Sequence, residues 1–289
     1  MSAQALALVI SGALLHALWN LFAKKAAGGL AFVWLFGAVS VLVSLPFGAA
    51  ALQAHSHQLT APVWAAIAGS AAVHVAYSLV LQKGYRESDF SVVYPLARGT
   101  GPLFAVLGAI AVLGEMPSGP GWCGIAAVLA GIFLLAGLGR LSHPRTARAS
   151  AGVFWGVLTG LTIAAYTVID GWAVKALGVD PLLYYFLGLV LRTAILAPQA
   201  LHARDRLAAQ WRSNGRYAVA VGVLSPLAYT LVLYAVTMAP LSYVAPVREL
   251  SMLIGVLAGA RVLREVLDLP RVAGTVCMVA GVVLLALAG

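Results

Sequence analysis

The 289-residue sequence contains few charged residues: 9% of the chain, where a soluble protein carries roughly 25%. Its nine acidic residues are scattered, so neither an acidic metal-ligand cluster nor a pair of catalytic carboxylates can be recognised. No Walker motif for nucleotide phosphates occurs. With 62% hydrophobic residues and a mean hydropathy of +0.96, the composition predicts an integral membrane protein. The scattered acids and the missing motif favour a protein with no cofactor, no metal and no enzymatic activity.

Cysteine is also rare. Cys123 and Cys277 each lie inside a hydrophobic segment without a CxxC or histidine spacing, which excludes a disulfide framework and a metal-binding motif. The net charge of +9 comes from basic residues between hydrophobic segments rather than from a basic patch with interleaved aromatics, so no nucleic-acid partner is expected.

Ten apolar segments are each about 18–25 residues long, which is enough for a spanning helix. They cover residues 4–23, 30–52, 61–82, 90–113, 120–139, 151–174, 182–200, 216–237, 241–260 and 270–288. The connections are short except for two polar stretches, 139–150 and 202–216. The sequence therefore predicts an all-α integral membrane protein with ten transmembrane helices and no soluble domain.

Fourteen of the 18 basic residues follow odd-numbered segments. Under the positive-inside rule these connections face the cytoplasm, and both termini lie outside. Lys175, at the end of the sixth segment, is interpreted as reaching to the interface with its head group.

The chain contains an internal repeat. A shift of about 150 residues aligns the two halves and matches Arg98 with Arg248, Asn20 with Asp170, His16 with Tyr166 and, after a small gap, Tyr77 with Tyr229. The sequence predicts a first five-helix repeat over 1–142 and a second over 150–289. Because five is odd, the second repeat enters the membrane upside down, which is a transporter signature.

Three stretches carry a more specific signal: His16–Asn20, Val93–Gly99 and Ser242–Glu249. With the two five-helix halves and the Gly-Glu and Arg-Glu ends of segments four and nine, they make the sequence similar to the drug/metabolite transporter (DMT) superfamily. The resemblance is to its ten-helix EamA-type members and includes a branch associated with phosphonate utilisation. It implies alternating access around a site formed mainly by segments 1, 3, 4, 6, 8 and 9. Many EamA-type proteins keep their termini in the cytoplasm, whereas the loop charges here predict the opposite.

Three arginines lie deep in apolar segments: Arg98, Arg192 and Arg248. Arg98 and Arg248 are each roughly 11–13 Å along their helices from opposite faces, so both approach the middle of the bilayer. The nearby acids are Glu249 and Asp170, which leaves one arginine without an evident partner. One interpretation is a site for an anionic or zwitterionic solute; the other is a structural clamp such as Arg98 with Glu249.

Helical spacing places polar side chains beside these charges. Tyr94 and Arg98 share a face, as do His74, Tyr77 and Ser78. The candidate substrate-binding residues are Arg98, Tyr94, Arg248, Glu249, His74, Tyr77, Asn20, Trp19, Tyr166 and Tyr229. The candidate proton-coupling residues are His16, His74, Asp170 and Glu249.

Other features have structural interpretations. Trp19, Tyr184 and Tyr185 are typical of interface aromatics, although Trp19 stays among the site candidates. Glu115 and Glu265, which end segments four and nine, are interpreted as capping or loop-anchoring residues. Helix breaks are expected at Pro95, at 99–102 and at Pro246. The glycines of segments 120–139 and 270–288 indicate packing or self-association, with a homodimer as one outcome.

Taken with the resemblance, these residues predict a secondary transporter in a bacterial inner membrane, crossing it many times. Its cargo would be a small anionic or zwitterionic metabolite such as an amino acid, an organic acid or a phosphonate. Two alternatives stay open: a lipid or lipid-linked-sugar flippase of the same fold, and an integral-membrane enzyme acting on a lipid phosphate.

Overall fold

The computed structural model describes residues 1–26, 29–88, 90–135, 147–254 and 269–288. These residues form helices and contain no strand, as the sequence predicts. The helices are α1 (Ala3–Ala26), α2 (Gly29–His55), α3 (Ala61–Glu87), α4 (Phe90–Leu113), α5 (Gly119–Leu135), α6 (Ala147–Lys175), α7 (Pro181–His202), α8 (Arg204–Met238), α9 (Leu241–Arg248) and α11 (Leu269–Leu287), with a short 3₁₀ turn η1 (Ser56–Gln58).

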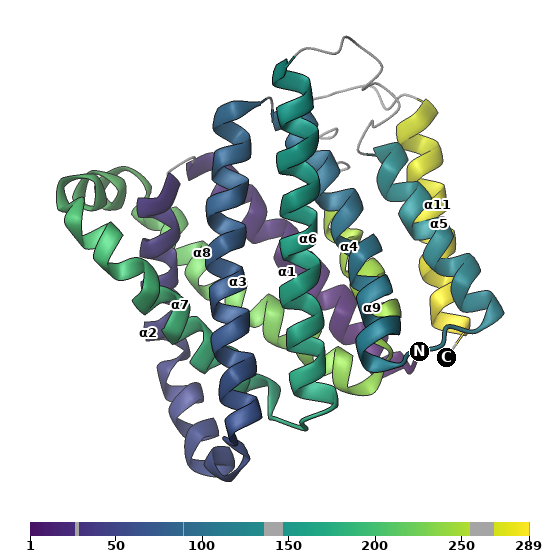
Figure 1. Cartoon of the computed structure of the whole chain (residues 1–289), viewed down its shortest axis with the longest axis horizontal. Helices are drawn as coiled ribbons and strands as arrows, with labels where there is room; N and C mark the ends of the chain where they lie inside the picture. The colour runs from purple at the N-terminus through teal and green to yellow at the C-terminus, as the bar shows by residue number, and fades with distance from the viewer. Residues whose placement is uncertain (27–28, 89, 136–146, 255–268, 289) are drawn as a thin grey trace.

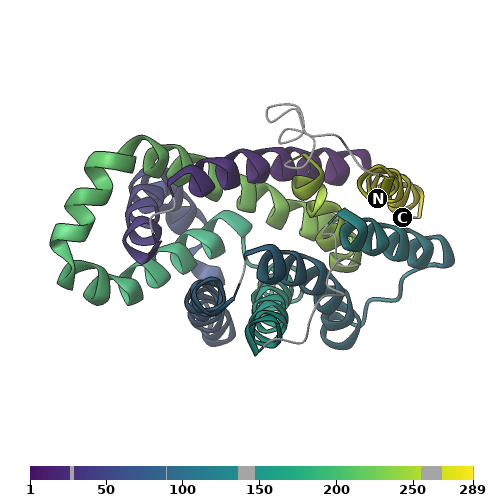
Figure 2. The same ribbon diagram turned by 90° about the horizontal axis from the view of Figure 1, so that it is seen from above.

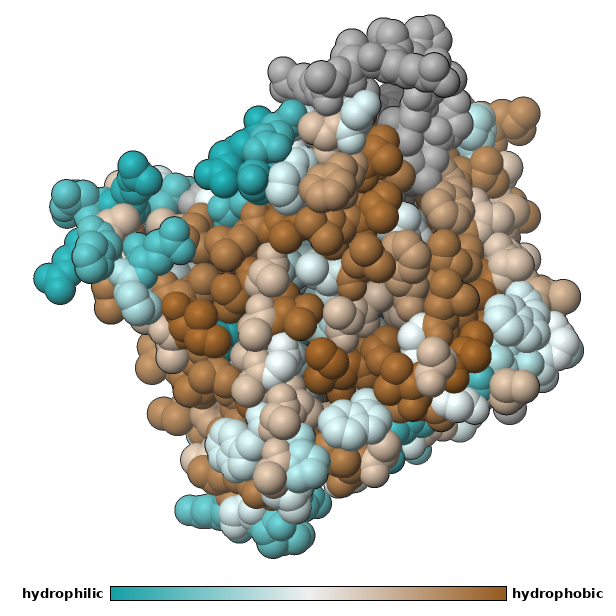
Figure 3. Space-filling model, viewed as in Figure 1, coloured by the Kyte–Doolittle hydropathy of each residue, from teal (hydrophilic) through white to brown (hydrophobic). Residues whose placement is uncertain are grey.

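Eight of the described helices are long and apolar enough to cross a membrane, and α5 is a shorter apolar helix of 17 residues. The predicted segment 241–260 is described as far as Ile254. Large apolar side chains such as Leu42 (69% exposed) and Phe47 (62% exposed) point outward. The visible face in Figure 3 is mostly hydrophobic, with hydrophilic residues gathered near its ends. The chain is a multi-pass membrane protein.

Both termini lie at one end of the molecule (Figure 1). The amino group of Met1 donates a hydrogen bond to the carbonyl oxygen of Ala286 at 2.8 Å. The last turn of α1, which carries Lys24 and Lys25, lies at the opposite end. These two basic residues therefore lie away from the termini, and the orientation of the chain in the membrane stays a prediction.

Helix α8 begins at Arg204, so the prediction of a polar connection over 202–216 is wrong. This stretch contains four arginines and three alanines, which favour helix even where the segment is too polar for the bilayer. Leu207 is buried, and the side-chain amide of Asn214 donates to the carbonyl oxygen of Ala26 at 3.2 Å. The hydrogen bond attaches the polar extension of α8 to the end of α1.

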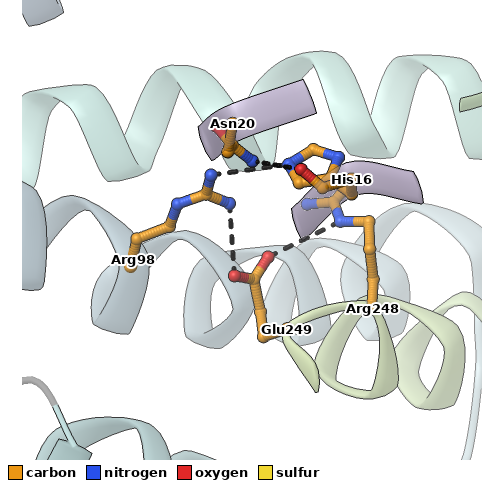
Figure 4. Close-up of polar contacts among 5 residues, drawn as sticks. All are labelled: His16, Asn20, Arg98, Arg248 and Glu249. Carbon is orange, nitrogen blue, oxygen red and sulfur yellow. Dashed lines mark hydrogen bonds and ion pairs between the residues drawn. The ribbon is translucent and has the colours of Figure 1, made fainter. Parts of the chain in front are cut away.

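The helix packing repeats when the two halves are exchanged (Figures 1 and 2). Helix α1 packs on α8 as α6 packs on α3, and α2 packs on α8 as α7 packs on α3. Within the described ranges, equivalent helices of the two halves pack together: α2 with α7, α4 with α9, and α5 with α11. The α4–α9 contact brings together the two arginines that the repeat matches, Arg98 and Arg248 (Figure 4), which are called the twin arginines below.

Helices α5 and α11 pack through glycines and form a pair at one side of the molecule (Figure 2). A Cβ atom on Gly131 would lie 2.7 Å from the carbonyl oxygen of Gly274, and one on Gly281 would lie 2.8 Å from that of Gly124. Such contacts allow the backbones to approach closely. The glycine faces are thus used within the chain, and the predicted homodimer would have to use other faces of these helices.

Helix α4 runs without interruption from Phe90 to Leu113, so the predicted breaks at Pro95 and 99–102 are wrong. It lies against glycines of α6: a Cβ on Gly156 would be 2.7 Å from that of Leu96, and one on Gly160 would be 3.0 Å from the backbone nitrogen of Gly101. A close neighbour of this kind stabilises a proline-containing helix in a membrane.

The expected break near Pro246 is confirmed. Helix α9 ends at Arg248, and the backbone N–H of Glu249 bonds to the carbonyl oxygen of Pro246 at 3.0 Å instead of continuing the α-helical pattern. Helical backbone resumes at Leu250. The interruption places Arg248 and Glu249 at a turn beside the centre of the fold.

Candidate functional site

A cavity of about 140 Å³ lies between the two halves. Side chains of α1, α2, α3, α4, α6, α7, α8 and α9 line it. The predicted site residues that line it are His16, Trp19, His74, Tyr77, Arg98, Tyr166, Tyr229 and Arg248. The predicted residues that do not line it are Asn20, Tyr94, Asp170 and Glu249.

Glu249 lies between the twin arginines (Figure 4). Its Oε2 accepts a hydrogen bond from Nη1 of Arg98 at 3.3 Å, and its Oε1 lies 3.6 Å from Nε of Arg248. Glu249 and Arg248 are 1% and 3% exposed. One carboxylate is therefore shared by two guanidinium groups, and the cluster keeps a net charge of +1. This is the predicted Arg98–Glu249 clamp, with both arginines still facing the cavity.

His16 extends the cluster onto α1 (Figure 4). Nη2 of Arg98 lies 3.4 Å from Nε2 of His16. A guanidinium can only donate, so this Nε2 is the acceptor. The side-chain amide of Asn20 donates to the carbonyl oxygen of His16 at 2.8 Å. Asn20 thus bonds to its own helix. Tyr94 stacks on the Arg98 guanidinium, with 5.6 Å between the ring centroid and Cζ.

Aromatic rings form another wall of the cavity. His74 stacks on Tyr166 with ring centroids 3.9 Å apart, and Tyr77 meets the edge of Tyr166 at 5.9 Å. Tyr229 lies 5.2 Å from Tyr185. These rings can contact the apolar part of a bound solute or attract a positive group through their faces.

Asp170 lies beside this wall, 1% exposed, and joins four helices. Its carboxylate accepts hydrogen bonds from the hydroxyls of Ser70 on α3, Tyr184 on α7 and Tyr229 on α8. This carboxylate, one of the four predicted proton-coupling candidates, is therefore bonded to three hydroxyl donors, and it lies next to the cavity rather than in its wall. Among the described residues, Asp170 has no basic side chain within ion-pair distance.

Tyr184 and Tyr185 are not interface aromatics, and that prediction is wrong. Their exposed fractions are 3% and 6%. Tyr184 bonds to Asp170 at 2.8 Å, and Tyr185 lines the cavity. Aromatic residues near the start of a helix resemble an interface belt in sequence, but the packing of α7 against α3 and α8 turns both rings inward.

The sequence-based site also missed the contributions of α2 and α7. The cavity-lining residues absent from the predicted set include Trp34, Tyr185, Arg192, Thr193 and Ser225. Arg192 had a visible signal, a charge in the middle of an apolar segment. The repeat did not indicate Arg192 as a site residue, because its counterpart under the 150-residue shift is Leu42.

Glu115 anchors the connection after α4, as predicted. Its carboxylate accepts hydrogen bonds from the backbone N–H groups of Leu241 and Ser242 at 2.7 and 2.8 Å, and from Nζ of Lys175 at 2.9 Å. Burial by itself would raise the pKa of the Glu115 carboxyl, but these donors outweigh it and hold the pKa below its ordinary value. Lys175 therefore makes an ion pair instead of only reaching toward the interface. Glu265, for which the same anchoring role was predicted, lies outside the described residues.

A family model for the EamA-like transporter family matches residues 3–137 and again residues 150–287. The chain is also similar to a solved crystal structure, described only as that of a protein, with a TM-score of 0.76 over 100% of this chain and 98% of the other. Their sequences are 15% identical, so this likeness concerns the fold. No curated protein matches the sequence.

Proposed function

Because the chain belongs to the EamA-like transporter family and is a membrane transporter of the drug/metabolite type, we propose that it carries a small metabolite with an anionic group. The cargo would be an amino acid, an organic acid or a phosphonate, moved by alternating access. The observation that carries this proposal is the central cavity, which is lined by three arginines. Among the described residues, one carboxylate forms ion pairs with two of these arginines, and the third has no ion pair.

The charge balance supports an anionic cargo. Arg98, Arg192 and Arg248 contribute three positive charges, and Glu249 compensates one of them. Asp170 provides a second negative charge at a greater distance when it is ionised. A positive charge that remains uncompensated in the membrane is costly, so a binding site for an anion is its most economical explanation. A negatively charged group on the solute would complete the balance.

The size of the cavity supports a small cargo. Its volume of about 140 Å³ is similar to that of an engineered protein cavity that holds benzene. An amino acid or a small phosphonate fits such a space in this conformation. A lipid-linked sugar is far larger, so the flippase alternative requires an opening to the bilayer, and the lipid-phosphate enzyme requires a longer substrate groove.

Alternating access is supported by the packing of the two halves. The α2–α7, α4–α9 and α5–α11 contacts join equivalent helices, so one half can rock against the other around the shared cavity. The interruption of α9 at Glu249 provides a bending point beside the cavity. The same proposal includes coupling to protons through one of four residues: Asp170, Glu249, His16 or His74. It also places the protein in a bacterial inner membrane with both termini outside.

Uptake into proteoliposomes that contain the purified protein tests the proposal. Radiolabelled glycine, alanine, succinate and 2-aminoethylphosphonate would be supplied with and without an inward proton gradient. We expect saturable uptake of at least one of them above protein-free liposomes. Uptake restricted to cationic solutes, or scrambling of a labelled lipid with no solute uptake, would reject the proposal.

A further inference from the structure

One face of α7 carries a stripe of cavity-lining residues: Tyr185, Leu189, Arg192 and Leu196. Their spacing of four, three and four residues places them on the same side of the helix. Arg192 lies ten residues before the end of α7 at His202, roughly 15 Å along the helix. Its guanidinium group is thus held near the middle of the membrane, where a charge is seldom kept without a function.

Arg192 is partly buried and makes few contacts for a cation inside a membrane protein. One of its nitrogens, Nη2, donates to the hydroxyl of Tyr185 at 2.7 Å, and the guanidinium lies 5.0 Å from the centroid of the same ring. No carboxylate oxygen of the described residues lies within ion-pair distance of it. A guanidinium has five N–H donors, so most of them are available to a ligand in the cavity.

The acidic side chain beside Arg192, that of Asp170, is already hydrogen-bonded to other residues. A small second cavity of about 10 Å³, close to the space of one water molecule, is lined by both Arg192 and Asp170. The Asp170 carboxylate accepts hydrogen bonds from Ser70, Tyr184 and Tyr229. It moderates the charge of Arg192 from across this gap without forming an ion pair with it.

The other two cavity arginines already form ion pairs with a carboxylate. Arg98 and Arg248 share the Glu249 carboxylate, and Arg98 also contacts His16. A substrate anion that bound to either of them would compete with Glu249. Arg192 has no such competitor among the described residues.

We infer that Arg192, held by Tyr185, is the subsite that receives the anionic group of the cargo. This inference rests on the proposed function and assigns its binding residue. The ligand class is a carboxylate or phosphonate, because a guanidinium fork presents two parallel N–H donors to two oxygens of either group. Stacking on Tyr185 orients the plane of the fork, and the aromatic wall contacts the rest of the solute.

Binding of small anions by Arg192→Lys tests this subsite. The purified protein would be titrated with methylphosphonate, acetate, 2-aminoethylphosphonate and glycine while tryptophan fluorescence is recorded, because Trp19 and Trp34 line the cavity. Arg216→Lys is a matched control. Arg216 also bonds to a tyrosine hydroxyl, that of Tyr217 at 3.1 Å, and stacks on its ring, but it is exposed and lies outside the cavity.

We expect Arg192→Lys to weaken binding of the best probe by about tenfold or more, since a lysine keeps the charge but lacks the fork. Arg216→Lys should bind like the wild type, and the unfolding temperature of ligand-free Arg192→Lys should stay near that of the wild type. If the wild type binds a probe and Arg192→Lys binds it equally well, the Arg192 assignment is wrong while the proposed function stands. If the wild type binds none of the four probes, the anionic cargo class and the Arg192 subsite both fail.

Discussion

Arg98 and Glu249 are 151 positions apart in the sequence, and Nη1 of the arginine lies 3.3 Å from Oε2 of the glutamate. The contact joins α4 of the first repeat to the turn after α9 of the second. Because Oε1 of the same glutamate faces Arg248, a single buried carboxylate holds the twin arginines of both repeats. The shared site therefore depends on this one acidic side chain for its internal charge balance.

Replacing this carboxylate by an amide of the same shape should destabilise the protein. In Glu249→Gln two buried guanidinium groups lose their counter-charge, and we expect the free energy of unfolding to fall by about 3 kcal/mol. Glu87→Gln is the control: its ion pair with Lys83 is exposed (46% and 49%), so its loss should cost about 0.5 kcal/mol or less. Thermal unfolding in detergent measures both. Equal stability of the two variants would contradict a buried central ion pair.

The ionised carboxylate of Glu115 should stabilise the protein only above acidic pH. Its folded pKa lies below the ordinary value of 4.5, so its contribution is present above 4.5 and is lost as the pH falls through the folded pKa. We expect Glu115→Gln to be less stable than the wild type at pH 7 by about 2 kcal/mol. That difference should shrink below pH 4.5 when unfolding is followed as a function of pH. A difference that stays constant down to pH 3 would show that the charge of Glu115 is not responsible.

The close packing of α5 on α11 should not tolerate a side chain at its glycines. In Gly131→Val the new Cβ atom would lie 2.5 Å from Cγ of Met278, so we expect a loss of about 1–3 kcal/mol from overpacking. Gly69→Val in α3 is the matched control, because a Cβ there meets no atom within 4 Å. Comparison of the two unfolding temperatures separates the packing effect from the cost of valine in a helix. Similar temperatures would mean that the two helices can move apart at little cost.

Asp170, one of the four proposed proton-coupling residues, lies beside the cavity and bonds to hydroxyls of α3, α7 and α8. If it carries the coupled proton, Asp170→Asn should lose the stimulation of uptake by an inward proton gradient while solute exchange at equal pH continues. Tyr184→Phe removes one hydroxyl donor from the same carboxylate without removing the carboxylate itself, so its uptake should remain stimulated by the gradient. Gradient-stimulated uptake by Asp170→Asn would place the coupling elsewhere.

Much of the fold could be predicted from the sequence because a membrane restricts the chain to long apolar helices. The positions of the helices and the repeat followed from segment length and the 150-residue shift. The early start of α8 could not be predicted, because its first turns are polar and are stabilised by contacts such as that between Asn214 and Ala26. Likewise α4 continues past its prolines without a break because α6 lies close beside it.

The site could be predicted where a charge lay deep in an apolar segment or where the repeat or helical spacing indicated it. Arg98, Arg192 and Arg248 were recognised as charges inside apolar segments, and the repeat matched Arg98 with Arg248 and His16 with Tyr166. Arg192 has no counterpart, and Tyr185 is recognisable as a site residue only once α7 is packed on its neighbours. Apolar segments look alike in sequence on the sides that face lipid and the cavity, so the wall formed by α2 and α7 needed the structure.

The central claim is that the cavity takes an anionic group, and competition with matched solutes tests it most directly. Uptake of whichever labelled anion the proteoliposomes transport would be measured with its unlabelled acid or with the corresponding amide in excess. The acid should suppress uptake, whereas the amide, which has the same shape without the negative charge, should compete at least about tenfold more weakly because it cannot form the charge-assisted fork with arginine. Equal inhibition by the acid and the amide would contradict recognition of the anion by the cavity arginines.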